Sequence, residues 1–184
     1  MKVVFFGTPD FAVPSLEILA NHPLVEVVSV ISMPDRKSGR GHQLKSPEVI
    51  QFAKDKKLPF FQTENINKED DFLNELSKKK VDCFVVLAFA QFLSDKILNI
   101  PRLGSFNIHT SLLPKYRGAA PIQYALLAGY NSTGVSIQKM VKKMDAGDLV
   151  YDRPVSIHEK ETGGLLYTRL KFNAALALND FIQE

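Results

Sequence analysis

The sequence has 184 residues, of which 45% are hydrophobic and 23% are charged. This length and composition suit one ordinary globular domain, or one domain with a short extension, and argue against disorder. The single cysteine, Cys83, excludes an internal disulfide and therefore a disulfide-stapled secreted scaffold. No apolar run approaches the ~18 residues of a membrane span, and the short apolar start lacks a signal-peptide cleavage site. We therefore expect a soluble, cytoplasmic protein that has no membrane partner.

The first 21 residues predict a strand, a tight turn and a helix. Residues 3–6 are wholly apolar and are followed by Gly7, which is typical of a strand buried on both faces. Thr8, Pro9 and Asp10 then supply an N-cap, a first-turn proline and a negative charge for the start of a helix.

The rest of the chain alternates between apolar strand-like runs and helical patterns. We predict further strands at residues 25–31, 60–61, 81–88, 105–109, 135–140 and 149–157. We predict helices at residues 46–57, 66–80, 94–99 and 121–128, and a last one from about 162 to the end. This alternation predicts an α/β fold with a doubly wound, mostly parallel sheet and helices on both faces. Ligands of such sheets bind beyond the carboxyl ends of the strands.

Two polar side chains share one face of the strand predicted at 105–109. Asn107 and His109 are two residues apart, and side chains alternate between the two faces of a strand, so both point the same way. Asp145 follows the strand predicted at 135–140, and it reaches the same rim as His109 if the two strands run parallel. Ordinary structural explanations also exist: a hydrogen-bonded histidine beside a loop for His109, and a tight turn for Asp145.

The segment 110–121 is predicted to be a shaped loop, because it holds two prolines, a glycine and two small residues. Leu112 and Leu113 are apolar residues within it. They either anchor the loop in the core or form an apolar wall for a flat ligand, with backbone polar groups beside it.

Positive charge gathers between residues 35 and 57. The whole chain carries +3, from 23 basic and 20 acidic residues, whereas this window holds seven basic and three acidic residues, a net +4. Arg36, Lys37 and Arg40 open the window, and glycines on both sides of Arg40 let its side chain reach far. Because guanidinium is planar and always charged, this basic loop is a candidate for binding phosphate. A solvated, flexible surface loop explains the same residues.

Two common kinds of site find no support in the sequence. Only Gly7 of a G-x-G-x-x-G pattern is present, and Pro9 replaces the second glycine, which disfavours close approach of a pyrophosphate. The four histidines are scattered and the cysteine lies in a predicted strand, so we expect no metal site.

In combination, the motifs are far more specific than any one of them, and they resemble methionyl-tRNA formyltransferases. They occur in that family's order and spacing: GTPDFA at 7–12, PDR at 34–36, GRG at 39–41, NIH at 107–109, SLLP at 111–114, RGAAP at 117–121 and DAGD at 145–148. The resemblance covers essentially the whole chain and assigns residues 1–184 to the family's N-terminal catalytic domain, with its Rossmann-like fold. The family's C-terminal tRNA-binding domain is expected to be absent from this chain, whose last helix reaches Glu184 without a stop signal.

The resemblance implies transfer of a formyl group from 10-formyltetrahydrofolate to the amino group of initiator methionyl-tRNA, by a monomer without a metal. It implies that Asn107 and His109 hold the oxyanion that develops on the formyl oxygen, and that Asp145 supports His109. The implied folate-binding residues are Ser111, Leu112, Leu113 and Pro114. The implied tRNA-binding residues are Arg36, Lys37 and Arg40.

Two departures from the family's pattern and two alternatives stay open. Thr110 stands where a glycine is common, and the segment 87–90 reads Leu-Ala-Phe-Ala where Ala-Tyr-Gly is common. A sugar-nucleotide N-formyltransferase would use the same co-substrate and the same three catalytic residues with another amine. A non-catalytic nucleotide- or RNA-binding module is the alternative from another class.

Overall fold

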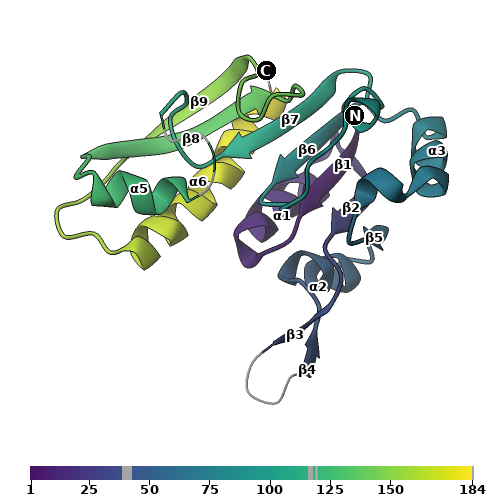
Figure 1. The fold of residues 1–184 in the computed structure, drawn as a ribbon, viewed down its shortest axis with the longest axis horizontal. Helices are drawn as coiled ribbons and strands as arrows, with labels where there is room; N and C mark the ends of the chain where they lie inside the picture. The colour runs from purple at the N-terminus through teal and green to yellow at the C-terminus, as the bar shows by residue number, and fades with distance from the viewer. Residues whose placement is uncertain (39–42, 116–117, 119, 184) are drawn as a thin grey trace. The chain divides into compact units, whose positions relative to one another are not determined.

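The computed structural model describes residues 1–38, 43–115, 118 and 120–183. The chain divides into two compact units, an N-terminal unit (Met1–Ser105) and a C-terminal unit (Phe106–Glu184). Each unit is described by itself below, and Figure 1 shows the elements of both. No helix in the described ranges is long and apolar enough to cross a membrane.

The N-terminal unit is built on parallel strands in the order β5-β2-β1-β6. These strands are β1 (Lys2–Gly7), β2 (Glu26–Ser32), β5 (Phe60–Gln62) and β6 (Cys83–Leu87). Residues 3–6 of β1 are all 0% exposed, which explains why this stretch is apolar at four successive positions instead of alternating. The helical segments of the unit are η1 (Asp10–Ala12), α1 (Val13–Asn21), α2 (Glu48–Asp55), η2 (Ile66–Lys68), α3 (Asp70–Lys78) and α4 (Asp95–Leu98).

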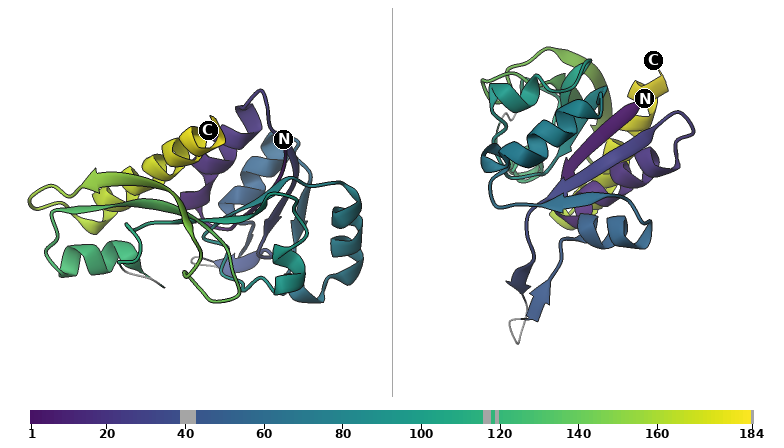
Figure 2. Two further views of the ribbon diagram at one scale, coloured as in Figure 1. Left: turned by 90° about the horizontal axis from the view of Figure 1, so that it is seen from above. Right: turned by 90° about the vertical axis from the view of Figure 1, so that its right-hand side faces the viewer.

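A two-stranded antiparallel hairpin leaves this unit between β2 and α2. It consists of β3 (Arg36–Ser38) and β4 (Gln43–Lys45), and it projects away from the parallel strands in Figure 1 and in the right-hand view of Figure 2. The sequence predicted only a loop here, because these three-residue strands read RKS and QLK, and a single apolar residue, Leu44, is too little for an apolar alternation. The root of the hairpin is held by Asp35, whose carboxylate accepts hydrogen bonds from Ser46 Oγ at 2.9 Å and Gln62 Nε2 at 2.7 Å.

The described residues of the C-terminal unit form three antiparallel strands and two helices. The strands β7 (Gly104–His109), of which the part from Phe106 on belongs to this unit, β8 (Ser132–Lys139) and β9 (Leu149–Ser156) pair in that order. The long helix α6 (Gly163–Gln183) packs on β8 and β9, as the left-hand view of Figure 2 shows, and α5 (Pro121–Leu127) packs against α6. The face of α6 that turns inward carries the buried residues Leu166, Leu170, Ala174, Ala177 and Leu178.

Candidate active site

His109 is the last residue of β7, and its buried ring makes contact through both nitrogens. The residue is 8% exposed; Nδ1 lies 3.0 Å from Ser111 Oγ, and Nε2 lies 3.2 Å from the backbone oxygen of Gly118. The hydroxyl of Ser111 donates its own proton to the backbone oxygen of Lys115 at 2.6 Å. Since a hydroxyl has one proton to donate, Ser111 Oγ acts as an acceptor toward Nδ1.

Asp145 completes the surroundings of the imidazole. Its Oδ2 lies 3.7 Å from His109 Nε2, and the two side chains are each 9% exposed. The same Oδ2 accepts a hydrogen bond from the backbone nitrogen of Gly118 at 2.8 Å, while Oδ1 accepts one from Gln138 Nε2 at 2.8 Å. Both nitrogens of His109 therefore face oxygen acceptors, and the hydrogen-bond geometry is fully satisfied when both carry a proton.

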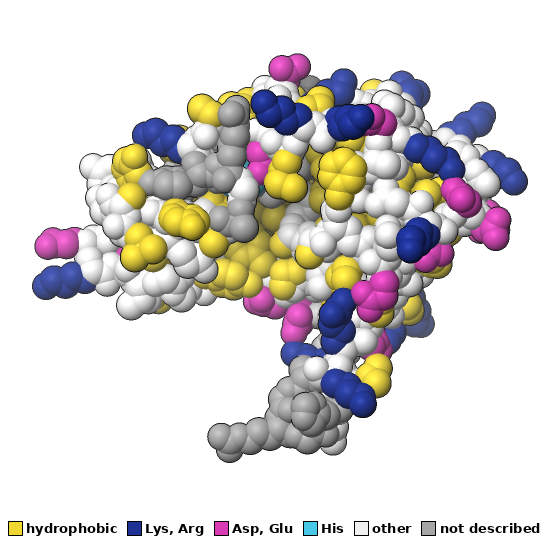
Figure 3. All heavy atoms as spheres, viewed as in Figure 1, with side chains coloured by type: hydrophobic (Ala, Val, Ile, Leu, Met, Phe, Trp, Pro, Cys, Tyr) yellow, Lys and Arg dark blue, Asp and Glu magenta, His cyan; other side chains and the backbone are white. Residues whose placement is uncertain are grey.

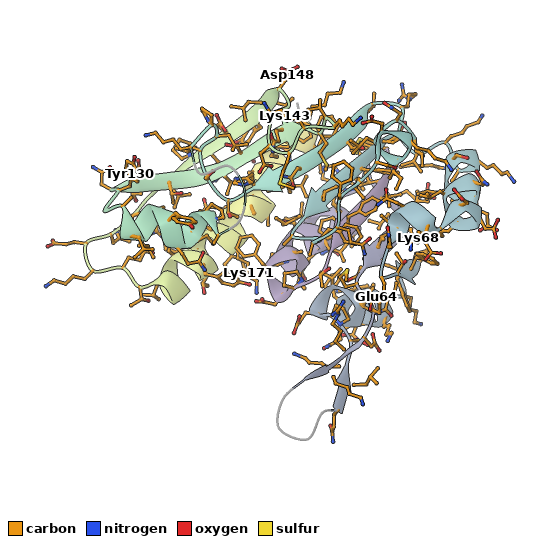
Figure 4. The ribbon with its side chains drawn as sticks, in the orientation of Figure 1. Glu64, Lys68, Tyr130, Lys143, Asp148 and Lys171 are labelled. Atoms are coloured by element: carbon orange, nitrogen blue, oxygen red, sulfur yellow. The ribbon has the colours of Figure 1, made fainter. Side chains whose placement is uncertain are left out.

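The loop between β8 and β9 brings Asp145 to this position by turning back on the sheet. Asp145 has a left-handed backbone conformation, with φ of 49°, which Asp tolerates better than most residues do. A Cβ atom built on Gly147 would overlap the backbone oxygen of Lys139, so the returning chain passes β8 closer than any other residue type allows. Figure 4 labels Lys143 and Asp148 on the two sides of this turn.

Asp145 lies beside His109, but β7 and β8 do not run parallel, so the premise from which this position was predicted is wrong. Strand β8 runs antiparallel to β7, with Phe106 opposite Lys139 and His109 opposite Ser136. The carboxyl end of β8 is therefore beside the amino end of β7, and it is the backward turn of the 140–148 loop that brings Asp145 to the imidazole. Asn107 is half-buried in the middle of β7, on the same face as His109 and opposite Gln138.

The loop predicted to contact folate is anchored at two points by one hydroxyl. Ser136 Oγ accepts from the backbone nitrogen of Leu113 at 3.0 Å and also contacts the backbone oxygen of Ser111 at 2.9 Å. Leu113 is buried, and Leu112 packs so closely on β8 that a Cβ on Gly134 would collide with it. Leu113 thus anchors the loop, whereas Pro114 is exposed. The role of these residues in folate binding stays a prediction.

Sequence reasoning missed Ser136 and Gln138, both of which hold parts of this site. A signal was present: they are polar residues two positions apart that alternate with the apolar Val135 and Ile137, so they share one face. The contributions of Gly118 and Lys115 come from backbone atoms, and residue types do not reveal these.

The predicted tRNA-binding residues belong to the N-terminal unit. Arg36 and Lys37 lie on β3 and are exposed, whereas Arg40 lies outside the described residues. Arg36 pairs with Glu64 at 2.8 Å, and both side chains are more than 60% exposed, so the pair is weak. Basic and acidic side chains are mixed around the described part of the hairpin in Figure 3. Within the described ranges, no group of three or more His, Cys, Asp or Glu side chains is placed to hold a metal ion.

Comparison with known proteins agrees with the resemblance seen in the sequence. The formyl transferase family model matches residues 1–182. The methionyl-tRNA formyltransferase of Halothermothrix orenii is 44% identical over 170 residues, which cover 92% of this chain and 54% of that protein. The methionyl-tRNA formyltransferase of Pseudoalteromonas translucida is 42% identical over 184 residues, which cover 100% of this chain and 57% of that protein. The chain thus spans about half the length of the curated relatives it matches.

Solved structures agree with the α/β fold. A phosphoribosylglycinamide formyltransferase from Anaplasma phagocytophilum superposes with a TM-score of 0.80 at 19% identity, covering 99% of this chain and 84% of that one. A glycinamide ribonucleotide transformylase from Geobacillus kaustophilus superposes with a TM-score of 0.81 at 21% identity, covering 98% and 96%. The predicted fold class, an α/β protein with a mostly parallel sheet, is confirmed. With its match over residues 1–182, the chain belongs to the formyl transferase family.

Proposed function

We propose that this chain transfers the formyl group of 10-formyltetrahydrofolate to the amino group of initiator methionyl-tRNA. The observation that carries the proposal is the setting of His109, whose two ring nitrogens both face oxygen acceptors beside the buried carboxylate of Asp145. This setting suits an imidazole that carries two protons and a positive charge. A cationic donor is what a developing oxyanion requires.

The reaction joins the amine nitrogen to the formyl carbon and breaks the bond between that carbon and the folate nitrogen. In the tetrahedral intermediate, the carbonyl electrons reside on the formyl oxygen as an oxyanion. Asn107 donates to this oxygen through its side-chain amide, and His109 donates through Nε2–H. That proton is the available one, since Nδ1–H is held by Ser111 at 3.0 Å whereas the contact of Nε2 with Gly118 is longer, at 3.2 Å.

Asp145 has two tasks in this scheme. Its negative charge stabilises the imidazolium of His109 in a site that is largely closed to water. It also relays the proton that the attacking amine loses to the folate nitrogen that leaves, so the atoms and charges balance. Ser111, Leu112, Leu113 and Pro114 contact the folate in this proposal.

The choice of acceptor rests on the named relatives and on the hairpin. The relatives that are about 40% identical are named methionyl-tRNA formyltransferases, and the exposed Arg36 and Lys37 suit contact with tRNA phosphates. Phosphate contacts would supply affinity that falls as the salt concentration rises.

An acceptor competition tests this function. The chain is incubated with 10-formyltetrahydrofolate and, in separate reactions, with charged initiator tRNA, a nucleotide-sugar amine or a glycinamide ribonucleotide. Formylation of the methionyl-tRNA is expected to be the most efficient by kcat/KM. Efficient formylation of one of the two small amines, with none of the methionyl-tRNA, would show that the acceptor has been assigned incorrectly.

A further inference from the structure

Gln138 is a buried polar residue of β8 that the packing of the strand does not explain. It is 2% exposed, and its Nε2 donates to Asp145 Oδ1 at 2.8 Å. Its Oε1 is buried and has no hydrogen-bond partner among the residues that the structure describes. An unpaired buried carbonyl oxygen is unfavourable, so an apolar side chain of the same length would suit the packing better. What the glutamine adds is the bond to Asp145.

That bond determines how the carboxylate of Asp145 is turned. Asp145 lies in the loop between β8 and β9 with φ of 49°, and the carboxylate of an aspartate can turn about its last side-chain torsion unless hydrogen bonds hold it. Two donors remove this freedom, because Gly118 N holds Oδ2 and Gln138 Nε2 holds Oδ1, each at 2.8 Å. With both oxygens held, Oδ2 faces Nε2 of His109. Gln138 is the donor that ties this arrangement to the sheet.

The register of the sheet places Gln138 at the centre of the site. It is opposite Asn107 in the antiparallel pair of β7 and β8, on the face that carries His109. We infer that Gln138 is a positioning residue that orients Asp145 toward His109 and thereby sets the rate of formyl transfer, an inference that rests on the proposed function. It acts through Asp145 and is not assigned a contact with substrate.

Three variants of β8 test the inference. Gln138→Met keeps the length of the side chain and removes the donor, whereas Gln138→Glu keeps its shape and, when ionised, places a second negative charge beside Asp145. Thr133→Val is the matched control, because Thr133 is a buried polar residue of the same strand whose hydroxyl has no partner among the described residues. For each variant, kcat, both KM values and the Tm are measured near neutral pH.

We expect Gln138→Met to lower kcat about 10- to 100-fold, as a small misplacement of a reacting group does. The KM values for donor and acceptor are expected to stay within about twofold of wild type, since binding groups are untouched. Gln138→Glu is expected to be slower than Gln138→Met, and Thr133→Val to match wild type. If Gln138 served packing alone, its variants would change the Tm, but kcat would not fall in the order from wild type to Gln138→Met to Gln138→Glu. Wild-type kcat in Gln138→Met would overturn the inference.

An NMR measurement separates failure of the inference from failure of the proposed function. If the wild-type chain formylates none of the three acceptors, the proposed function fails, and the inference is then decided from the histidine ring signals. We expect Gln138→Met to shift the ring ¹H and ¹⁵N signals of His109 and to leave those of His158 in place. Unchanged His109 signals would overturn the inference.

Discussion

His109 Nε2 and Asp145 Oδ2 lie 3.7 Å apart, in a setting where each side chain is only 9% exposed. Partial burial strengthens the attraction between an imidazolium and a carboxylate, because less water screens the two charges. The carboxylate also accepts hydrogen bonds from Gly118 and Gln138, which offset the cost of burying its charge. The pair is therefore built to persist in the folded protein.

Removing either proposed oxyanion donor is expected to lower the rate of formyl transfer. His109→Ala and Asn107→Ala each remove one donor, and one such donor contributes roughly 2.7–4 kcal/mol, or about 10²–10³ in kcat. Single-turnover kinetics with saturating substrates measure the effect. The Tm of each variant serves as the control for folding. A variant that folds and retains near-full turnover would contradict the proposed mechanism.

Gly147→Ala is expected to displace Asp145, although Gly147 itself does not contact His109. The new Cβ would overlap the backbone oxygen of Lys139, and the loop that carries Asp145 would have to move away from β8. We expect a loss of about 1–3 kcal/mol in the free energy of unfolding, together with lower kcat. Urea unfolding and steady-state kinetics measure both.

The matched control for this glycine is Gly164→Ala in the first turn of α6. A Cβ on Gly164 meets nothing within 4 Å, so the substitution is expected to be neutral or slightly stabilising. Equal stability losses in the two variants would mean that the close passage of the loop at Lys139 is unimportant.

The sequence predicted much of the fold because its signals are local. The all-apolar run at 3–6 and the amphipathic pattern at 66–80 both correspond to elements of the structure, although the second divides into η2 and α3. The direction of β8 could not be predicted in this way, because apolar alternation is the same in parallel and antiparallel strands. Because of that ambiguity, β7 and β8 were wrongly expected to run parallel and to end at the same edge of the sheet.

The sequence predicted the side chains of the candidate site but not the backbone atoms that surround them. Asn107, His109 and Asp145 have residue types that suit the chemistry, and the structure gathers them in the C-terminal unit. The surroundings of His109 depend on the backbone oxygens of Gly118 and Lys115, which every residue type possesses. Gln138 was missed because its importance lies in the partner it meets, and a single sequence does not show that partner.

Neutralising the described part of the basic hairpin is expected to weaken the tRNA reaction selectively. The double variant Arg36→Gln/Lys37→Gln should raise KM for methionyl-tRNA and leave kcat nearly unchanged, because exposed charges act on binding. The slope of log affinity against log salt concentration should fall by about one for each phosphate that the variant no longer binds. Lys96→Gln is the matched control, since Lys96 and Arg36 have side chains that are each 63% exposed. An equal rise in KM in the control would argue against a specific role for the hairpin.

Cys83 is expected to be unreactive in the native protein. Burial raises the pKa of its thiol to about 12, with a smaller contribution from the negative charge of Asp82. Only the thiolate reacts, and at pH 8 about one thiol in ten thousand is ionised at that pKa. A disulfide reagent should therefore label Cys83 slowly in buffer and rapidly in concentrated urea. Rapid labelling without denaturant would show that this end of β6 opens easily.

The root of the hairpin is expected to weaken in acid through Asp35. Hydrogen bonds from Gln62 and then from Ser46 lower the pKa of this carboxyl below its ordinary value of 3.8. A group whose pKa is lower in the folded state stabilises that state above the unfolded pKa, and it loses this contribution as the pH falls through the folded pKa. Asp35→Asn should therefore be less stable than wild type at pH 7. The difference in the free energy of unfolding between the two proteins should shrink as the pH falls below about 4. The urea midpoints of the two proteins at pH 7 and pH 3 measure this difference in stability. If the midpoints differ by the same amount at both pH values, the charge of Asp35 does not stabilise the fold.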